Sequence, residues 1–119
     1  MRLRFLLDAH ITPRLKGALL RYDRTIEVMR LGDPGMPPLN TLDPEILAFT
    51  AQSQQVLVTE DYTTIPTHAA DHITRGGHHP GILLIRPGSG IRDVAEALYE
   101  LWYCSEAEEW IDLVRWIPL

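Results

Sequence analysis

Acidic residues follow two short apolar segments of the chain, and their type suggests chemistry. Asp8 comes directly after Phe5-Leu6-Leu7, and Glu60 and Asp61 follow Val56-Leu57-Val58-Thr59. A short apolar run bounded by polar residues is typical of a strand buried on both faces, as in parallel sheets covered by helices. Open parallel sheets bind ligands at the carboxyl ends of their strands. We therefore expect these acids to converge at one edge of a sheet.

A third acidic group, Asp43-Pro44-Glu45, stands where a helix is predicted to begin. Asp43 is also explained by N-capping alone, since an Asp before proline suits a helix start. Carboxylates that lie close together repel one another, and each needs a raised pKa, a cationic partner or a divalent metal. Mg²⁺ and Mn²⁺ prefer oxygen ligands and orient water for attack on a phosphodiester. The pattern predicts a Mg²⁺ or Mn²⁺ site formed by Asp8, Asp43 and Asp61, with Glu45 as an accessory ligand.

Residues near these acids suggest further roles. His10 follows Asp8 closely and could contact phosphate or transfer a proton near neutral pH, or it could be a turn residue. Arg14 and Lys16, with Arg21 and Arg24, cluster in and just after the first predicted helix. This strip could steer RNA phosphates, or it could be a solvated helix face.

Histidines form a second candidate group. His68 and His72 are four residues apart in a predicted helix, and His78 and His79 follow in a glycine-rich turn. The spacing resembles a set of transition-metal ligands, although exposed histidines explain it equally. His68 has one further possible role, because its helix begins at the strand end that carries Asp61.

Composition limits the class of protein. The 119 residues fit a single domain, residues 1–119, with 45% hydrophobic and 23% charged residues. No segment approaches a membrane span, and the N-terminus does not resemble a signal peptide, so we expect a cytoplasmic protein with no membrane partner. The net charge of -5 argues against tight nucleic-acid binding through phosphate contacts alone, but does not exclude a nuclease. The single Cys104 cannot form an internal disulfide and is expected to be buried or half-buried.

The predicted elements alternate between strand and helix. Strands are expected at residues 5–7, 25–29, 56–59, 81–85 and 114–117, the last at an edge. Helices are expected at residues 13–22, 44–53 and 91–103, and another begins near residues 63–66. Alternation of this kind implies an α/β three-layer sandwich with a mostly parallel sheet, because parallel neighbours are joined by right-handed helical crossovers.

Several of these segments together resemble a known family. Phe5-Leu6-Leu7-Asp8, Pro13-Arg14-Leu15, Leu42-Asp43-Pro44-Glu45-Ile46-Leu47, Val56 to Asp61 and Pro80-Gly81-Ile82-Leu83-Leu84-Ile85 are similar to the PIN-like domains of bacterial proteins related to VapC-type toxins. The resemblance implies a PIN-like α/β/α sandwich with about five strands and Mg²⁺- or Mn²⁺-dependent RNA cleavage. The metal ligands would be Asp8, Asp43 and Asp61. It also implies an antitoxin protein that blocks the site.

The chain departs from the family pattern after the third acid. Relatives often carry Asp-x-Asp-Phe there, whereas this chain reads Asp61-Tyr62-Thr63-Thr64. A fourth acid is therefore missing, and Thr63 or Thr64 could only donate a hydrogen bond to water or phosphate. Asp71 is a possible substitute, or a solvated acid. The alternative function is a catalytically degenerate PIN-like module that binds RNA or a protein partner.

Aromatic residues concentrate in the last quarter of the chain. These are Tyr99, Trp102, Tyr103, Trp110 and Trp116. Packing in the core explains most of them, and a partly exposed patch could serve as a homodimer interface.

Overall fold

The structure is a computed structural model that describes residues 1–118. Its elements, in chain order, are β1 (Phe5–Leu7), α1 (Arg14–Tyr22), β2 (Val28–Arg30), α2 (Asp43–Ser53), β3 (Val56–Thr59), α3 (Ile65–Thr74), β4 (Ile82–Ile85), α4 (Ile91–Cys104), the short 3-10 helix η1 (Ala107–Trp110) and β5 (Val114–Ile117). The strands form a five-stranded sheet in the order β2-β1-β3-β4-β5. Every neighbouring pair is parallel, so the sheet is wholly parallel where a mostly parallel one was predicted. The predicted α/β class and the edge position of β5 are confirmed.

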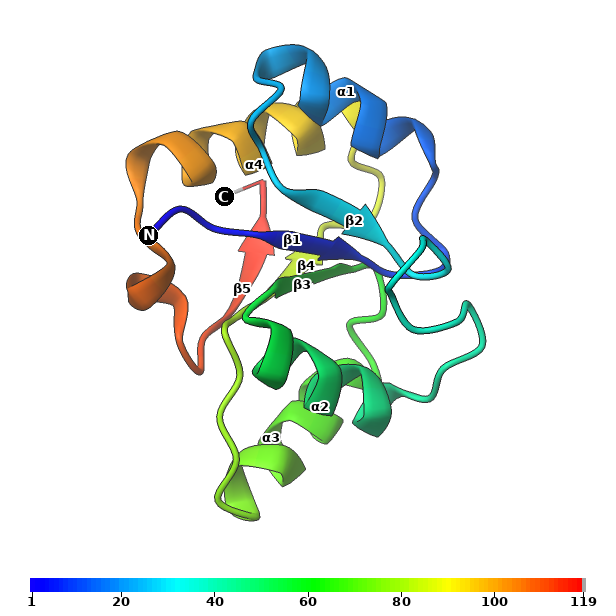
Figure 1. Cartoon of the computed structure of the whole chain (residues 1–119), viewed down its shortest axis with the longest axis vertical. Coiled ribbons are helices and arrows are strands. Elements are labelled where there is room, and N and C mark those ends of the chain that lie inside the picture. The colour runs from blue at the N-terminus through cyan, green and yellow to red at the C-terminus, as the bar shows by residue number, and fades with distance from the viewer. Residues whose placement is uncertain (119) are drawn as a thin grey trace.

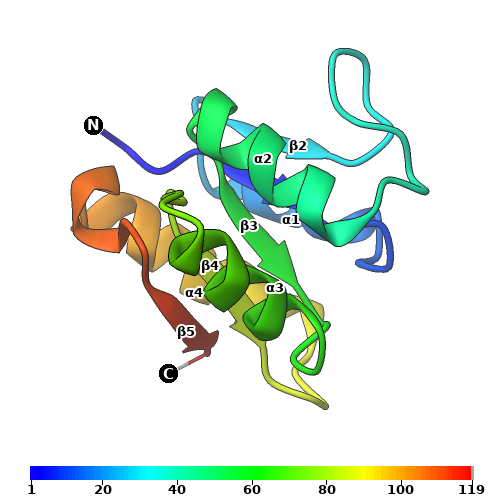
Figure 2. The same cartoon turned by 90° about the horizontal axis from the view of Figure 1, so that it is seen from below.

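The helices cover both faces of the sheet. Figures 1 and 2 show α1 and α4 on one face and α2 and α3 on the other. Side chains of β1 alternate between these layers: Phe5 and Leu7 pack in the cluster that contains α1 and α4, and Leu6 packs in the cluster that contains α2 and α3. Because both faces are covered, each position of an inner strand is apolar. This is the physical reason for the unbroken run Ile82–Ile85.

Several element boundaries differ from the prediction, by one to three residues. β2 begins at Val28, because the Asp23 carboxylate accepts hydrogen bonds from the backbone N–H and the hydroxyl of Thr25 and so holds this stretch in a turn. α1 begins at Arg14, one residue later than predicted. α2 begins at Asp43 with Leu42 in the N-cap position, and no side chain caps it. The capping interpretation of Asp43 is therefore wrong. Its carboxylate lies in the first turn of α2, where the helix dipole favours negative charge.

Two further observations concern surface and composition. Within residues 1–118, no helix combines the length and the apolar character that a membrane crossing requires. Cys104 lies at the end of α4 and is exposed, which corrects the prediction that it is buried or half-buried.

Candidate functional site

Asp8 lies at the carboxyl end of β1 and is held by the neighbouring strand. Its backbone N–H donates to the Val58 carbonyl at 2.9 Å, which extends the pairing of β1 with β3. Its side chain is only 9% exposed. One carboxylate oxygen accepts the Ala9 N–H at 2.8 Å, and the other accepts the Thr59 hydroxyl at 2.7 Å. Asp8 is therefore a nearly buried carboxylate whose direction is fixed by β3.

Thr59 connects the ends of the two strands. Its side chain is fully buried, and its hydroxyl donates to Asp8 and accepts the Asp61 N–H at 3.0 Å. Thr59 lies in a predicted strand but is not among the predicted site residues. The signal was a single hydroxyl residue at the end of an aliphatic run, directly before two acids. Thr59 is thus a positioning residue for both Asp8 and Asp61.

Asp61 accepts hydrogen bonds from the turn that follows it. One oxygen accepts the Thr63 N–H at 3.1 Å, the Thr63 hydroxyl at 3.0 Å and the Thr64 N–H at 2.9 Å. The other oxygen accepts the Thr64 hydroxyl. These bonds, led by the Thr64 hydroxyl, lower the pKa of Asp61 below its usual value. The sequence predicts a raised pKa, a cationic partner or a metal at each crowded carboxylate. At Asp61, neutral donors from Thr63 and Thr64 stabilise the charge instead.

Asp43 joins the same polar group through Thr64. The Thr64 hydroxyl lies 3.2 Å from a carboxylate oxygen of Asp43 while it also contacts Asp61. A hydroxyl has one proton, so it donates to only one of the two carboxylates at a time. The Nε2 atom of His68 lies 3.8 Å from the same oxygen of Asp43. A continuous chain of contacts therefore runs from Asp8 through Thr59, Asp61 and Thr64 to Asp43, with His68 at its end.

Other predicted residues make no hydrogen bond or ion pair with this group within residues 1–118. Glu45 and His10 are exposed, and neither side chain forms a hydrogen bond or ion pair within residues 1–118. Lys16 pairs with Asp33 at 3.0 Å and so fixes the loop after β2. Arg14 is exposed at the start of α1.

The donor chemistry suits a hard divalent cation, but the side chains are not gathered round one point. Carboxylate oxygens are the ligands that Mg²⁺ and Mn²⁺ prefer. Over residues 1–118, no three side chains of His, Cys, Asp or Glu are grouped closely enough to hold an ion together. The Thr64 hydroxyl occupies the space between Asp43 and Asp61. A cation bound through these same two oxygens would compete with the Thr64 hydroxyl for them.

The second histidine group lies at the opposite edge, where β4 and β5 begin. Nδ1 of His78 lies 2.6 Å from the Asp112 carboxylate, whose other oxygen accepts the His79 N–H at 3.0 Å. The His79 ring is 2% exposed, and neither ring nitrogen has a hydrogen-bond partner within residues 1–118. His72 contacts the His78 carbonyl instead of sharing a partner with His68. The interpretation of the histidines as exposed is therefore wrong for His79.

The buried His79 is expected to make the stability of the fold depend on pH. Burial lowers the pKa of His79 below its ordinary value of 6.5. The neighbouring Asp112 raises this pKa, whereas His72 and His78 lower it further. His79 has a lower pKa in the folded protein than in the unfolded chain. At pH values between the two, the unfolded chain binds more protons, so the free energy of unfolding falls as pH drops below about 6.5. Urea unfolding at pH 7.5, 6.5 and 5.5 measures this slope. His79→Leu should reduce it and the exposed control His10→Gln should not; equal slopes for His79→Leu and the unchanged protein would contradict the prediction.

The carboxyl edge of the sheet thus brings three predicted acids into one hydrogen-bonded group with Thr59, Thr63 and Thr64, and places His68 3.8 Å from Asp43. Its carboxylates and hydroxyls are groups that can hydrogen-bond to water. Comparison with protein-family models, curated proteins and solved structures finds no match. The functional assignment therefore depends on the geometry of the site and on the motifs of the sequence.

Proposed function

We propose that this chain is a Mg²⁺- or Mn²⁺-dependent endoribonuclease of the PIN-like type and acts as the toxin of a toxin–antitoxin pair. The observation that carries the proposal is the contact chain that links Asp8, Asp61 and Asp43 through Thr59 and Thr64. The acids lie at the carboxyl edge of a parallel sheet, where such folds bind ligands. Cleavage of cellular RNA would place the protein in the cytoplasm.

Each residue of the site has a distinct role in this proposal. Asp8, Asp43 and Asp61 would hold the ion, which when bound supplies an activated water for attack on the phosphodiester. Thr59 fixes the direction of Asp8, and the Thr64 hydroxyl links Asp43 and Asp61. His68, whose Nε2 lies 3.8 Å from Asp43, would be an accessory residue on that side of the site. Glu45 and His10 are exposed and available to water or RNA.

The proposed antitoxin would cover exposed apolar side chains beside the acids. Leu42 precedes Asp43 and is 67% exposed, and Tyr62 follows Asp61 and is 50% exposed. A partner that packs on these two side chains would block the edge of the sheet. A homodimer through the C-terminal aromatic residues stays a prediction; Trp102 belongs to the core, and Tyr103 is the most exposed of that group.

The second candidate function is a degenerate PIN-like module that binds RNA or protein without cleavage. Two observations favour it. Asp61 already accepts four hydrogen bonds from Thr63 and Thr64, and no three-residue metal group is present within residues 1–118. Calorimetry distinguishes the two candidates, because only the nuclease needs the ion.

Calorimetric titration of Mn²⁺ tests the proposal. We expect the unchanged protein to bind Mn²⁺ and the variant Asp8→Asn/Asp61→Asn to lose binding while circular dichroism shows it folded. Asp93→Asn/Glu100→Gln is the matched control, because it removes the same charge from two exposed acids of α4 outside the contact chain. Equal loss of Mn²⁺ binding in both variants would show that net charge, and not the candidate site, accounts for the binding. Absence of binding to the unchanged protein would reject the nuclease and favour the degenerate module.

A further inference from the structure

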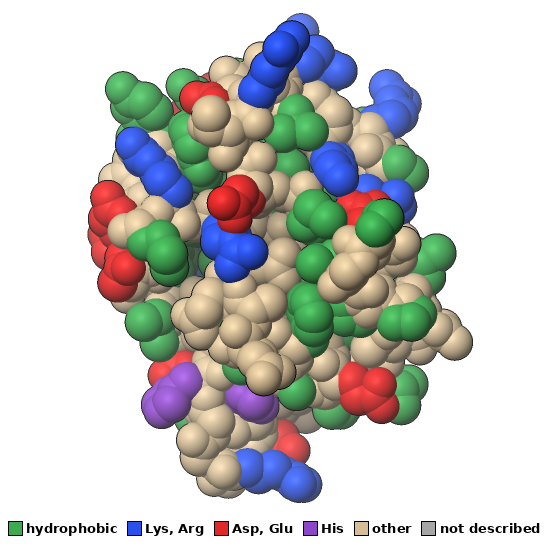
Figure 3. Space-filling view, viewed as in Figure 1, with side chains coloured by type: hydrophobic (Ala, Val, Ile, Leu, Met, Phe, Trp, Pro, Cys, Tyr) green, Lys and Arg blue, Asp and Glu red, His purple; other side chains and the backbone are tan. Residues whose placement is uncertain are grey.

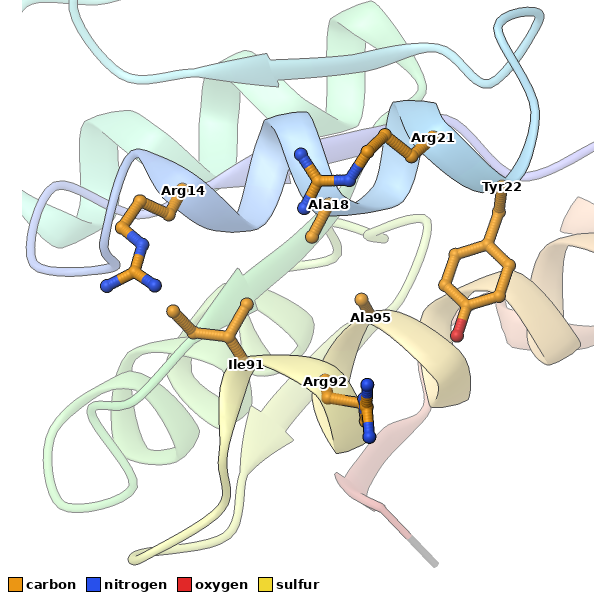
Figure 4. A pocket seen from close by; sticks show the side chains of 7 residues that line it. All are labelled: Arg14, Ala18, Arg21, Tyr22, Ile91, Arg92 and Ala95. Carbon is orange, nitrogen blue, oxygen red and sulfur yellow. The ribbon is translucent and has the colours of Figure 1, made fainter.

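A basic groove lies between α1 and α4, on the face of the sheet opposite α2 and α3. It has a volume of about 420 Å³, and its floor is formed by Ala18, Ile91 and Ala95. Figure 4 shows Ala18 and Ala95 facing one another from the two helices. Small side chains at this crossing leave the hollow open. The groove is therefore a surface feature that the packing of α1 on α4 creates.

Three arginines surround the groove. Arg14 and Arg21 come from α1 and Arg92 from α4 (Figure 4). All three are exposed, and none of their guanidinium groups forms a hydrogen bond or ion pair within residues 1–118. Two other basic side chains are neutralised, since Arg4 pairs with Glu27 and Lys16 with Asp33. Unpaired like charges around one hollow repel each other, and an anionic ligand relieves that repulsion.

The positive charge is local in an otherwise acidic protein. Figure 3 shows Lys and Arg side chains gathered in the upper part of one face, over the region where Figure 1 places α1. On the other side of α4, Asp93, Glu96 and Glu100 line a separate hollow of about 370 Å³ against the end of β5. A polyanion is attracted to the first hollow and repelled from the second. It would therefore be confined to the α1 side of α4.

An aromatic ring completes the groove. Tyr22 lines its far end, is 44% exposed, and stacks on Tyr99 with ring centroids 4.7 Å apart and an interplanar angle of 14°. Tyr99 in turn contacts the rings of Trp102 and Tyr103. A stacked tyrosine beside arginines is the chemistry that holds single-stranded nucleic acid, with bases on rings and phosphates on cations. An acidic peptide would satisfy the arginines but has no base to stack.

The groove begins beside the candidate site. α1 follows β1 and α4 follows β4, so both helices start at the carboxyl edge of the sheet. A small cleft lined by Ile11, Thr12, Glu60 and Ile91 lies between that edge and the groove, and Ile91 belongs to both. Arg14 and Arg21 are two helical turns apart, about 10 Å along α1. Together they mark a path that leads from the acids toward Tyr22.

We infer that the α1–α4 groove binds a single-stranded RNA segment that flanks the phosphodiester at the candidate site. Arg14, Arg21 and Arg92 contact its phosphates, and Tyr22 stacks on a base. The position of the scissile bond rests on the proposed ribonuclease function. Binding in the groove needs no metal and is measured without it.

Fluorescence anisotropy of a labelled 12-nucleotide oligouridine in EDTA tests this inference. We expect Arg21→Gln/Arg92→Gln to weaken binding at least tenfold. The matched control Arg75→Gln/Arg115→Gln, which removes one exposed arginine directly after α3 and one on β5, should change it less than twofold. The slope of log affinity against log salt should fall by about 1.4 in the groove variant, since each lost phosphate contact contributes roughly 0.7 for a single strand. Tyr22→Leu should weaken binding about fivefold or more with an unchanged salt slope.

Each alternative has its own outcome. No binding at low salt, or equal loss in both double variants, would overturn the inference. If polyglutamate displaces the labelled oligouridine as well as unlabelled RNA does, and Tyr22→Leu has no effect on binding, the groove would be assigned to an acidic protein. A dimer in light scattering that the groove variant converts to monomer would assign it to a second copy. If RNA binds in EDTA but the unchanged protein does not bind Mn²⁺, the proposed nuclease function is rejected and RNA binding in the groove is supported.

Discussion

Thr59→Val is expected to destabilise the fold by about 3 kcal/mol and to disrupt the candidate site. Valine has nearly the same shape but no hydroxyl, so Asp8 loses its buried donor and the Asp61 N–H loses its acceptor. A buried polar group left without a partner costs about 1–3 kcal/mol, and more when it is charged. The free energy of unfolding from urea titration, at a fixed pH of 7.5, measures the cost.

Thr50→Val is the matched control for this substitution. Thr50 is also a buried threonine, at 1% exposure, but its hydroxyl donates only to the Leu47 carbonyl within α2. We expect it to cost less than about 1 kcal/mol, since that carbonyl also belongs to the helix ladder. Thr59→Ser keeps the hydroxyl and should retain Mn²⁺ binding. Equal costs for the two valine variants would show that Thr59 does not couple the strand ends.

The strand positions could be predicted because the sheet is covered on both faces. Leu57 packs toward α2 and α3 while Val56 and Val58 pack toward α1 and α4, so both layers demand apolar side chains at consecutive positions. A run of this kind is visible in the sequence without any knowledge of partners. β2 was placed less accurately, because the Asp23 side chain holds Thr25 in a turn, and turns of this type compete with strand propensity.

The acids of the site could be predicted, but the hydroxyl contacts that join them could not. Asp8 and Asp61 are recognisable from their place after apolar runs. The bond from Thr59 to Asp8 depends on the β1–β3 register, in which Leu7 lies opposite Val58. Contacts across 51 residues leave no local pattern. Asp43 was open to a capping interpretation for the same reason, since only the tertiary contact with Thr64 distinguishes the two roles.

His79 shows the opposite failure, in which local composition was misleading. The turn that contains it is rich in glycine and proline, and such turns are usually exposed. Asp112, 33 residues away, accepts its backbone N–H and draws the turn against the start of β5. The ring is then buried, at 2% exposure. Only the position of β5 could have revealed this.

Gly81→Ala is expected to destabilise the fold by about 3–4 kcal/mol. Gly81 precedes β4 with φ of +131°, a conformation that residues with a side chain rarely adopt. A Cβ atom there would lie 2.8 Å from the Trp110 carbonyl oxygen. Backbone strain costs about 1–3 kcal/mol and overpacking about 1–3 kcal/mol. Movement of Trp110 would also weaken the bond that its carbonyl accepts from the Leu113 N–H at 3.0 Å, at the start of β5.

Gly88→Ala separates the two contributions. Gly88 also has a positive φ, +82°, but a Cβ atom there would have no other atom within 4 Å. It should cost about 1–2 kcal/mol, the strain alone. Urea unfolding of both variants gives the difference, which measures how tightly η1 packs on the entry to β4. A cost for Gly81→Ala no larger than that for Gly88→Ala would mean that Trp110 moves away freely, and that the β4–β5 edge does not depend on this contact.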